Sequence, residues 1–407
     1  MGEAYAAPAG QTLRAGRHAL PAWRRALAAG HWAAVGNTPT AVNPYSDAAL
    51  NPLLGSSNAP WNGSTTMSGN RFANIITAWC GGVWHEGLKR LFITGGGHGD
   101  YAGNEWISCD LSLDTPAWSL ASPPSGSAAR KWSGWTPTAG VLDNGAGAIY
   151  PDGRPRAVHT YNNLAVDREG YLWLGGGSQF RAGSLLVCAA KFDPYRGDYV
   201  TLGDVNTFPY SAVNAWGLHC YDSNRHCLYS SNTGLARVRR YAIDADTWTQ
   251  QIGYELDRGV YCMSLYDEAR DIVVSRNNAA FLGGAHDTAE IEILNLANGT
   301  SGHPVVSGPV EFDWTTWHGR TGMAYYPPWD AYLVWPSGSA TVYRLDPPAV
   351  GGDYFSGWAL TALSTVAGAP TAGAANGTWG RFWASESLKC CGVINAVAES
   401  MHVFALE

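Results

Sequence analysis

The chain has 407 residues, of which only 14% are charged, and it contains 49 glycines and 19 tryptophans. This composition is unlike that of a helical enzyme, which is rich in Ala, Glu, Lys and Leu, and it favours many short strands joined by tight turns. The net charge of −7 argues against nucleic-acid binding, because that binding requires Lys and Arg to replace counterions around phosphate. No run of 18 apolar residues occurs, so we expect no membrane span.

Residues 1–30 form a segment of their own, with a short helix predicted over residues 20–30. Pro21 stands at the start of this helix and Gly30 at its end, which are the usual places for these residues. Charged residues interrupt the apolar residues of the segment, so we expect no secretory signal. These residues are Arg14, Arg17, Arg24 and Arg25.

From residue 75 onward the sequence repeats itself. Each unit has two strands that meet at a charged turn, as in "NLAVDREGYLWLGGGS", then a strand that ends in Asp, and finally an aromatic residue in a short β-like run, as in "RGDYVTLG". The alternation in "YLWLGGG" has the period of two that indicates a strand. A unit of four antiparallel strands over roughly 45 residues has the size of a propeller blade.

We therefore predict an all-β propeller over residues 31–407. Its blades lie near residues 75–122, 158–203, 210–253, 258–308, 321–364 and 373–407. The last unit has three strands, and "HWAAVGN" at residues 31–37 belongs to no unit. We expect this strand to lie beside residues 401–406, because a ring closed by both ends leaves no open sheet edge. One unit lacks a clear outer aromatic residue, which leaves six or seven blades open.

Two stretches rich in Pro, Ser, Asn and Gly lie outside the repeat, at residues 38–70 and 123–157. Loops of this length in a folded domain usually have a function. We expect residues 38–70 and the N-terminal segment to contact neighbouring subunits of a larger assembly.

The eight cysteines show no Cys-x-x-Cys spacing, so we expect no zinc or other metal site. Most of them stand in apolar runs, and we interpret them as small buried residues. The segment "HCYDSNRHC" at residues 219–227 leaves open a cross-strand disulfide or a His/Cys site.

The segment "LFITGGGHGDYAGNEWISCDL" resembles the kelch motif, in which a strand, a diglycine, a loop and a second strand precede a Trp. The segment "GRPRAVHTYNNLAVDREGYLWLGGGS" resembles the next copy. Kelch-like propellers include galactose-oxidase-like central domains, polysaccharide lyases and binding modules, so the resemblance implies a fold and leaves the activity open. We expect Gly95–Gly97 to allow a turn and close packing.

Propellers bind ligands on the face where the innermost strand of each blade begins. Arg, His and aromatic residues recur at these places, and we expect them to line one funnel around the channel. The predicted ligand-binding residues are Trp216, Tyr261, Trp317, His318, Trp379 and Arg381.

The first functional hypothesis is recognition of a carbohydrate or another surface, because flat aromatic rings stack on sugar rings at a small entropic cost. A sugar-binding propeller without a leader sequence suggests a phage virion protein of the tail or capsid, exposed to a host glycan. The alternative is an extracellular protein, a mature secreted enzyme whose leader has been removed. The expected partners are that glycan and neighbouring structural subunits, and we expect no cofactor.

The alternative is a polysaccharide lyase. This chemistry needs a base that removes the proton beside a uronate carboxylate and a cation that neutralises the carboxylate. We predict His159 and Tyr161 for the proton transfer, and Arg156 and Arg320 for the carboxylate.

Two other enzyme classes fit less well. A glycoside hydrolase needs paired carboxylates, but acidic residues such as Asp167, Asp222 and Asp267 stand at blade turns, where they stabilise the turn. A copper radical oxidase needs a Tyr and His ligand set that the sequence does not match.

The sequence leaves open a metal or catalytic site at His98 and Asp100. The interpretation that we favour is that His98 and Asn104 hydrogen-bond the turn backbone and hold blade 1 against its neighbour, in a loop on the face opposite to the funnel.

Overall fold

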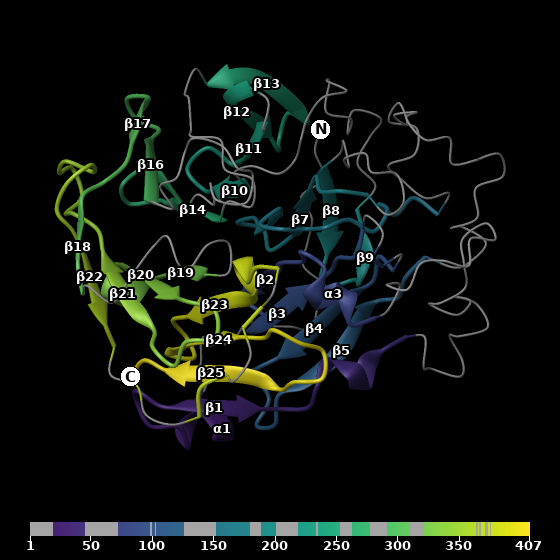
Figure 1. The fold of residues 1–407 in the computed structure, drawn as a ribbon. Coiled ribbons are helices and arrows are strands. Elements are labelled where there is room, and N and C mark those ends of the chain that lie inside the picture. The colour runs from purple at the N-terminus through teal and green to yellow at the C-terminus, as the bar shows by residue number, and fades with distance from the viewer. Residues whose placement is uncertain are drawn as a thin grey trace.

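A computed structural model of the chain describes fifteen segments. They are residues 19–44, 72–97, 100–101, 103–125, 152–179, 189–200, 219–232, 235–252, 263–276, 291–309, 321–363, 365, 368–370, 373–374 and 376–407. Within these segments the strands form six sheets arranged in a ring (Figure 1). The prediction of an all-β propeller is confirmed, and the number of blades is six.

The first three blades are meanders in which each strand pairs with the next. Blade 1 consists of β2 (Gly82–His85), β3 (Arg90–Ile93), β4 (Trp106–Asp110) and β5 (Ala117–Ser122). Blade 2 consists of β6 (Leu164–Val166), β7 (Leu172–Gly175), β8 (Ala189–Asp193) and β9 (Asp198–Tyr199). Blade 3 consists of β10 (His219–Asp222), β11 (Cys227–Asn232), β12 (Leu235–Ala242) and β13 (Thr247–Ile252).

The last three blades follow the same plan with two additions. Blade 4 consists of β14 (Met263–Asp267), β15 (Ile272–Arg276), β16 (Ile291–Asn295) and β17 (Thr300–Gly302). Blade 5 consists of β19 (Gly322–Tyr326), β20 (Ala331–Trp335), β21 (Tyr343–Asp346) and β22 (Trp358–Ala362), with β18 (Val306–Ser307) parallel to β22. Blade 6 consists of β23 (Phe382–Ser385), β24 (Cys390–Val393), β25 (Met401–Ala405) and β1 (Trp32–Val35).

The strand β1 closes the ring by pairing antiparallel with β25. Trp32 lies opposite Phe404, and Val35 lies opposite Met401. In Figure 1 the two strands lie side by side at the bottom of the ring, although they come from opposite ends of the chain. The predicted closure by an N-terminal strand is therefore confirmed.

The helices are short and lie outside the sheets. Those in the described segments are α1 (Ala22–Arg25), η1 (Pro39–Val42), α3 (Asn74–Thr77), η4 (Pro327–Trp329) and η5 (Trp379–Arg381). The helix α1 begins after Pro21 as predicted, but it ends well before Gly30. The N–H group of Gly30 instead donates to the Ala405 oxygen at 2.9 Å, so this glycine leads into the closing strand.

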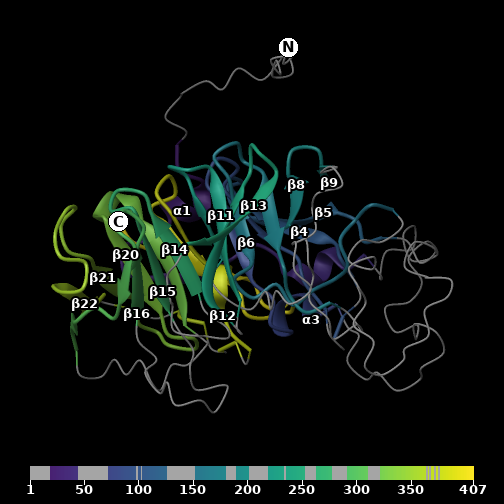
Figure 2. The ribbon, with the colours of Figure 1, turned by 90° about the horizontal axis from the view of Figure 1, so that it is seen from above.

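The ring has two distinct faces. The innermost strands β2, β6, β10, β14, β19 and β23 begin at one face, which we call the start face, and turn into the second strand at the other, which we call the turn face. The helix α3 precedes β2 at the start face, whereas α1 packs on a turn of blade 6, because Arg24 donates to the Leu388 oxygen at 2.6 Å. Figure 2 shows the two helices on opposite sides of the ring.

Turns at the turn face share one backbone conformation. In five blades a residue with φ between 46° and 53° stands directly before the second strand, and these residues are Lys89, His226, Asp271, Asp330 and Lys389. The acidic residues at blade turns cap them as predicted. Oδ1 of Asp222 accepts the Arg225 N–H group at 2.9 Å, and Oδ1 of Asp267 accepts the Arg270 N–H group at 3.0 Å.

Aromatic rings fill the spaces between neighbouring blades. Trp106 of blade 1 stacks on Phe192 of blade 2 with ring centroids 5.0 Å apart, and Trp335 of blade 5 stacks on Phe382 of blade 6 at 6.1 Å. These wedge-shaped spaces explain part of the tryptophan content, because each sheet needs large rings on the surface that faces the next sheet. In the described segments no helix is long and apolar enough to cross a membrane.

The described cysteines are buried and free. Cys220 and Cys227 stand in one hairpin, but Cys220 lies opposite Tyr229 and Cys227 lies opposite Asp222, so they form no disulfide. Burial raises the pKa of the Cys220 thiol well above its ordinary value, which keeps it protonated and unreactive. The interpretation of these cysteines as small buried residues is confirmed, while Cys188 and Cys262 lie outside the described residues.

Candidate functional site

His159 lies at the centre of a hydrogen-bonded series with Asp100 and Tyr161. Its Nε2 atom is 2.7 Å from Oδ2 of Asp100, and its Nδ1 atom is 3.2 Å from the Tyr161 hydroxyl oxygen. Because a carboxylate only accepts hydrogen bonds, Nε2 carries a proton, and in the neutral form of the ring Nδ1 accepts the proton of the Tyr161 hydroxyl. The arrangement can pass a proton between Tyr161 and His159 while Asp100 fixes the imidazole ring.

Two glycines hold the backbone around His159. Gly97 has a φ of 77°, and a Cβ atom there would lie 2.3 Å from the His159 nitrogen; Gly177 has a φ of 106°, and a Cβ atom there would lie 2.2 Å from the His159 oxygen. The His159 N–H group donates to the Ser178 oxygen at 3.0 Å. Only glycine allows both approaches, so the predicted role of the Gly95–Gly97 run in close packing is confirmed.

Three aromatic residues with strained backbones surround this site. Trp79, Tyr161 and Trp379 each stand three residues before the innermost strand of their blade, and their φ angles are 52°, 44° and 44°. The Trp79 ring lies 5.1 Å from the His159 ring, and the Tyr161 ring meets Trp379 edge-on at 5.5 Å. Positive φ is costly for bulky residues and concentrates at functional sites. The same position in blades 6, 1 and 2 is therefore a candidate for function.

Asp100 corrects one expectation about the faces of the ring. We placed its loop on the face opposite to the funnel, but the hydrogen bond to His159 puts Asp100 at the start face. The physical reason is the alternation of antiparallel strands. The second strand of a blade returns the chain to the face where the first strand began, so the loop between the second and third strands lies there. His98 lies outside the described residues.

The predicted arginines Arg156 and Arg381 are buried, with exposed fractions of 7% and 1%. Arg381 donates from Nη1 to the Ile394 oxygen at 2.8 Å and from Nη2 to the Gly377 oxygen. Burial lowers the pKa of the Arg381 guanidinium to about 10. The contacts of Arg381 therefore join the loop before β23, at Gly377, to the loop after β24, at Ile394, and its charge adds positive potential near the start face. Arg156 lies three residues before His159 in the chain.

Trp379, which we predict to bind ligand, is 2% exposed and packs its ring against Tyr161. The remaining predicted site residues lie outside the described residues. These are Arg320, Trp216, Tyr261, Trp317 and His318.

The central channel contains a cavity of about 320 Å³ that the innermost strands of all six blades line. At its turn-face end stand four aromatic residues, each one position before the last residue of its strand. We call this set the aromatic collar, and its members are Trp84, Tyr221, Tyr266 and Tyr325. The sequence analysis missed the collar. Its signal is an aromatic residue just before each charged turn, as in "VWHEG", "CYDSN", "LYDEA" and "AYYPP".

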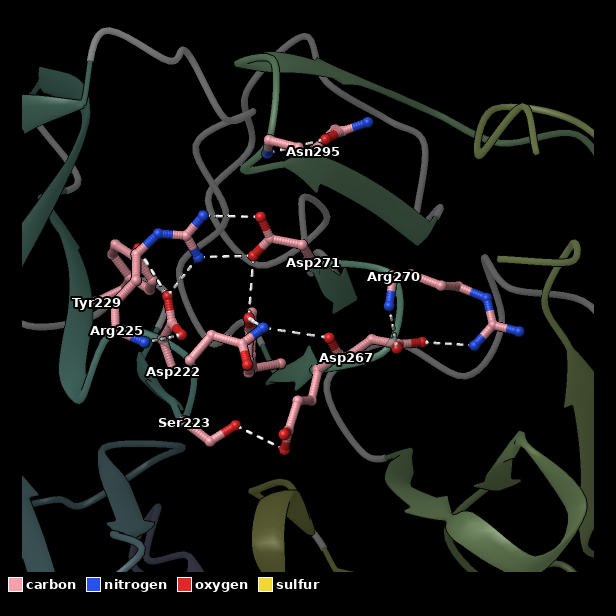
Figure 3. A network of polar contacts seen from close by, with 12 residues as sticks. Asp222, Ser223, Arg225, Tyr229, Asp267, Arg270, Asp271 and Asn295 are labelled. Carbon is pink, nitrogen blue, oxygen red and sulfur yellow. Dashed lines mark hydrogen bonds and ion pairs between the residues drawn. The ribbon is translucent and has the colours of Figure 1, made fainter. Parts of the chain in front are cut away.

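Arginine–aspartate pairs connect the turns of blades 3, 4 and 5, as Figure 3 shows in part. Arg225 of blade 3 donates to both oxygens of Asp271 in blade 4, at 2.6 and 2.7 Å. Arg270 of blade 4 donates to both oxygens of Asp330 in blade 5, at 2.7 Å each. The hydrogen bonds from the two arginines hold the pKa of Asp271 and of Asp330 below the ordinary value. Bidentate pairs fix geometry better than single contacts.

Comparisons with known proteins bear on the fold alone. No family model and no curated protein matches the chain. The WD40 repeats of RRP9 are similar at a TM-score of 0.43 and 10% identity, covering 82% of this chain and 94% of that one. An auxiliary nutrient binding protein from Bacteroides ovatus is similar at 0.44 and 10%, covering 81% and 69%. A gluconolactonase from Xanthomonas campestris is similar at 0.42 and 12%, covering 79% and 84%.

Proposed function

We propose that the start-face site performs acid–base chemistry on an acidic polysaccharide, as a lyase that removes the proton beside a uronate carboxylate. The observation that supports this proposal is the series Asp100–His159–Tyr161, with distances of 2.7 and 3.2 Å. A base that works near neutral pH needs a partner that takes its proton, and a histidine fixed by a carboxylate is such a partner. The kelch resemblance, which includes polysaccharide lyases, agrees with it.

In this mechanism Tyr161 passes its hydroxyl proton to Nδ1 of His159 and accepts the proton from C5 of the uronate. The electron pair of the C5–H bond forms a C4=C5 double bond as the C4–O glycosidic bond breaks. The leaving oxygen takes one proton from the Tyr161–His159 pair, which returns to its starting protonation state. Asp100 acts as a positioning residue, and we propose Arg156 and Arg320 for neutralising the carboxylate.

The test is incubation of the protein with a panel of uronate polysaccharides, followed by the ultraviolet absorbance of the new C4=C5 bond. We expect Tyr161→Phe to lower turnover by about 100-fold or more, since general acid–base groups contribute about 10²–10⁴-fold. Asp100→Asn should shift the pH profile of turnover.

The matched control is Tyr195→Phe. Tyr195 meets His85 edge-on at 5.9 Å and is 65% exposed, so it repeats the Tyr–His contact away from the site. The proposal fails if the wild type leaves every uronate polysaccharide intact, or if Tyr161→Phe turns over as fast as the wild type.

Recognition of a glycan without turnover is the second candidate. The burial of the site favours it, because His159 and Tyr161 are each only 3% exposed and a substrate must reach both. Glycan-array binding combined with unchanged substrate in the absorbance assay would support this candidate over the lyase.

We also propose the setting and the type of fold. A kelch-type propeller on a phage virion would meet a host polysaccharide, with residues 1–30 and 38–70 against neighbouring subunits. Residues 38–44, the described part of the 38–70 stretch, contact the ring of their own chain, since the N–H group and the hydroxyl of Thr40 donate to the Val397 oxygen at 3.0 and 2.7 Å. Mass spectrometry of purified virions tests the location.

A further inference from the structure

We propose that the turn-face end of the central channel binds a neutral sugar ring within the aromatic collar. This site is independent of the proposed lyase function, because it lies at the other end of the channel. It uses none of the residues of the Asp100–His159–Tyr161 series.

The aromatic rings at the two ends of the channel differ in exposure, with one exception. Tyr161 and Trp379 at the start face are 3% and 2% exposed, so their rings are used in packing. The exception is Trp79, which is of intermediate exposure and lies against the His159 ring. All four collar residues are of intermediate exposure and line the cavity. Trp84 keeps one ring face against Trp383, at a centroid distance of 4.1 Å and an angle of 11°. Partly exposed, flat rings are the type of surface on which a sugar ring stacks.

The collar tyrosines are held in place by the turns below them. The Tyr266 hydroxyl donates to Asp271 at 2.9 Å, and the Tyr325 hydroxyl donates to Asp330 at 2.7 Å. These are the two aspartates that the arginines of the preceding blades fix in turn. The rings therefore lose little freedom when a ligand binds, which is a main determinant of affinity at small sites.

The third collar tyrosine follows the same rule with a different partner. The Tyr221 hydroxyl lies 2.8 Å from Nδ1 of His226, and His226 occupies the position in blade 3 that Asp271 occupies in blade 4. Each tyrosine thus contacts the residue five positions after it. A rigid collar explains why these blades repeat an aromatic residue and a polar turn partner together.

The wall chemistry indicates a neutral, hydroxylated ligand. Among the described residues that line the cavity there is no Asp, Glu, Lys, Arg or His, and burying a charge there without a partner would be costly. The innermost strands are sheet edges, so main-chain N–H and C=O groups face the channel and can bind hydroxyl groups. The volume of about 320 Å³, which includes the part of the channel lined by Asn162 and Gly380 near the start face, is at the lower end of ligand sites and suits one sugar ring.

The collar has a gap on each side of Trp84. Each collar residue stands six positions before the second strand of its blade, and in blades 2 and 6 that position is occupied by Val166 and Ala384, which are small. A larger residue at Ala384 would narrow the cavity without removing a contact, and this provides a direct test.

Saturation-transfer NMR with glucose, galactose and cellobiose, and with glucuronate and galacturonate as charged comparators, tests the site. We expect transfer from the wild type to at least one neutral sugar and none to the uronates. Ala384→Leu and Trp84→Ala should each weaken that binding by about tenfold or more. The matched control is Ala34→Leu, the same enlargement at an exposed position of β1, which should leave binding unchanged.

Three results would overturn the proposal. The first is no transfer to any neutral sugar, and the second is equal transfer to the uronates. The third is unchanged binding in Ala384→Leu, a variant whose melting curve shows whether it is folded. Loss of lyase activity has no bearing on these results, so the two proposals fail separately.

Discussion

Blades 6, 1 and 2 are joined to one another differently from blades 3, 4 and 5. In the first half of the ring, backbones of blades 1 and 2 meet at glycines such as Gly81 and Gly97, and His85 of blade 1 contacts the Gly170 oxygen of blade 2 at 3.1 Å. In the second half, long side chains bridge the turns through bidentate ion pairs of Arg225 and Arg270. Direct contact between backbones restricts the movement of one blade against the next, which suits the positioning of reacting groups. The ion pairs connect the turns of blades 3, 4 and 5 through long side chains, and the rings of the aromatic collar line the turn-face end of the channel.

The largest effect should come from the ion-paired half. Arg270→Ala removes the partner of Asp267, whose side chain is fully buried while that of Arg270 is 2% exposed. We expect a loss of about 3–5 kcal/mol in the free energy of unfolding, since breaking a buried pair leaves an uncompensated charge. Urea unfolding measures it. Arg344→Ala is the control, because the Arg344–Asp346 pair is about one-third exposed and should contribute about 0–1 kcal/mol.

A somewhat smaller effect is expected in the half that meets through backbones. Gly97→Ala would place a Cβ atom 2.2 Å from the Ser178 oxygen, and we expect a loss of about 3 kcal/mol from overpacking and backbone strain. Gly153→Ala is the control, because Gly153 has a similar φ of 81° and nothing within 4 Å of the added atom. It should cost about 1 kcal/mol. Equal losses in thermal unfolding would contradict the role assigned to close approach.

As the pH falls, the free energy of unfolding should decrease first through a group in blades 6, 1 and 2, and only in stronger acid through groups in blades 3, 4 and 5. Burial holds the pKa of His85 below its ordinary value of 6.5, since the buried ring is poorly solvated when charged. In the neutral ring Nδ1 accepts the Leu88 N–H group at 3.1 Å. The unfolded chain then binds the proton more tightly. The stabilisation is complete above pH 6.5 and is lost as the pH falls through the lower folded value, by about 1.4 kcal/mol per unit of depression. His85→Gln should flatten this dependence of the melting temperature on pH.

The smallest effect should appear in stronger acid, in the ion-paired half. The pKa values of Asp271 and Asp330 lie below their ordinary value of 3.8, so their stabilisation is present above that pH and is lost below it. Their side chains are 24% and 53% exposed, so solvent screens the pairs. Asp330→Asn should flatten the stability profile below about pH 4 less than Asp271→Asn does. An unchanged profile in both variants would show that these pairs do not titrate on folding.

The fold was predictable because the same four-strand sequence pattern occurs several times along the chain. A four-strand unit that recurs, a final unit one strand short and an unassigned strand at residues 31–37 together imply a closed ring. The site was predictable only in part. His159 and Tyr161 were found because they stand together before a strand, but Asp100 was assigned to the wrong face, although the alternation of strands in a meander determines its place.

The burial of the site residues and the presence of the aromatic collar could not be predicted from the sequence alone. The burial of Trp379 depends on the ring of Tyr161 from another blade, and the approach of Gly380 to the Gly82 oxygen, 2.1 Å for an added Cβ atom, depends on how two loops meet. The collar gives one residue per blade, so its signal appears only when the blades are aligned by their turns. Contacts between repeats leave a weaker trace in sequence than the repeat itself.

The pairing of β1 with β25 has a consequence for how the molecule is made. Trp32 is synthesised well before the partner of that residue, Phe404, which lies 372 residues later in the chain (404 − 32). Each of blades 1 to 5 can assemble from one contiguous stretch as it emerges, whereas the sixth must wait for the contact between β1 and β25, and contacts between residues so far apart in sequence slow folding. Until β25 has been synthesised, β1 has no strand to pair with and the ring of blades remains open.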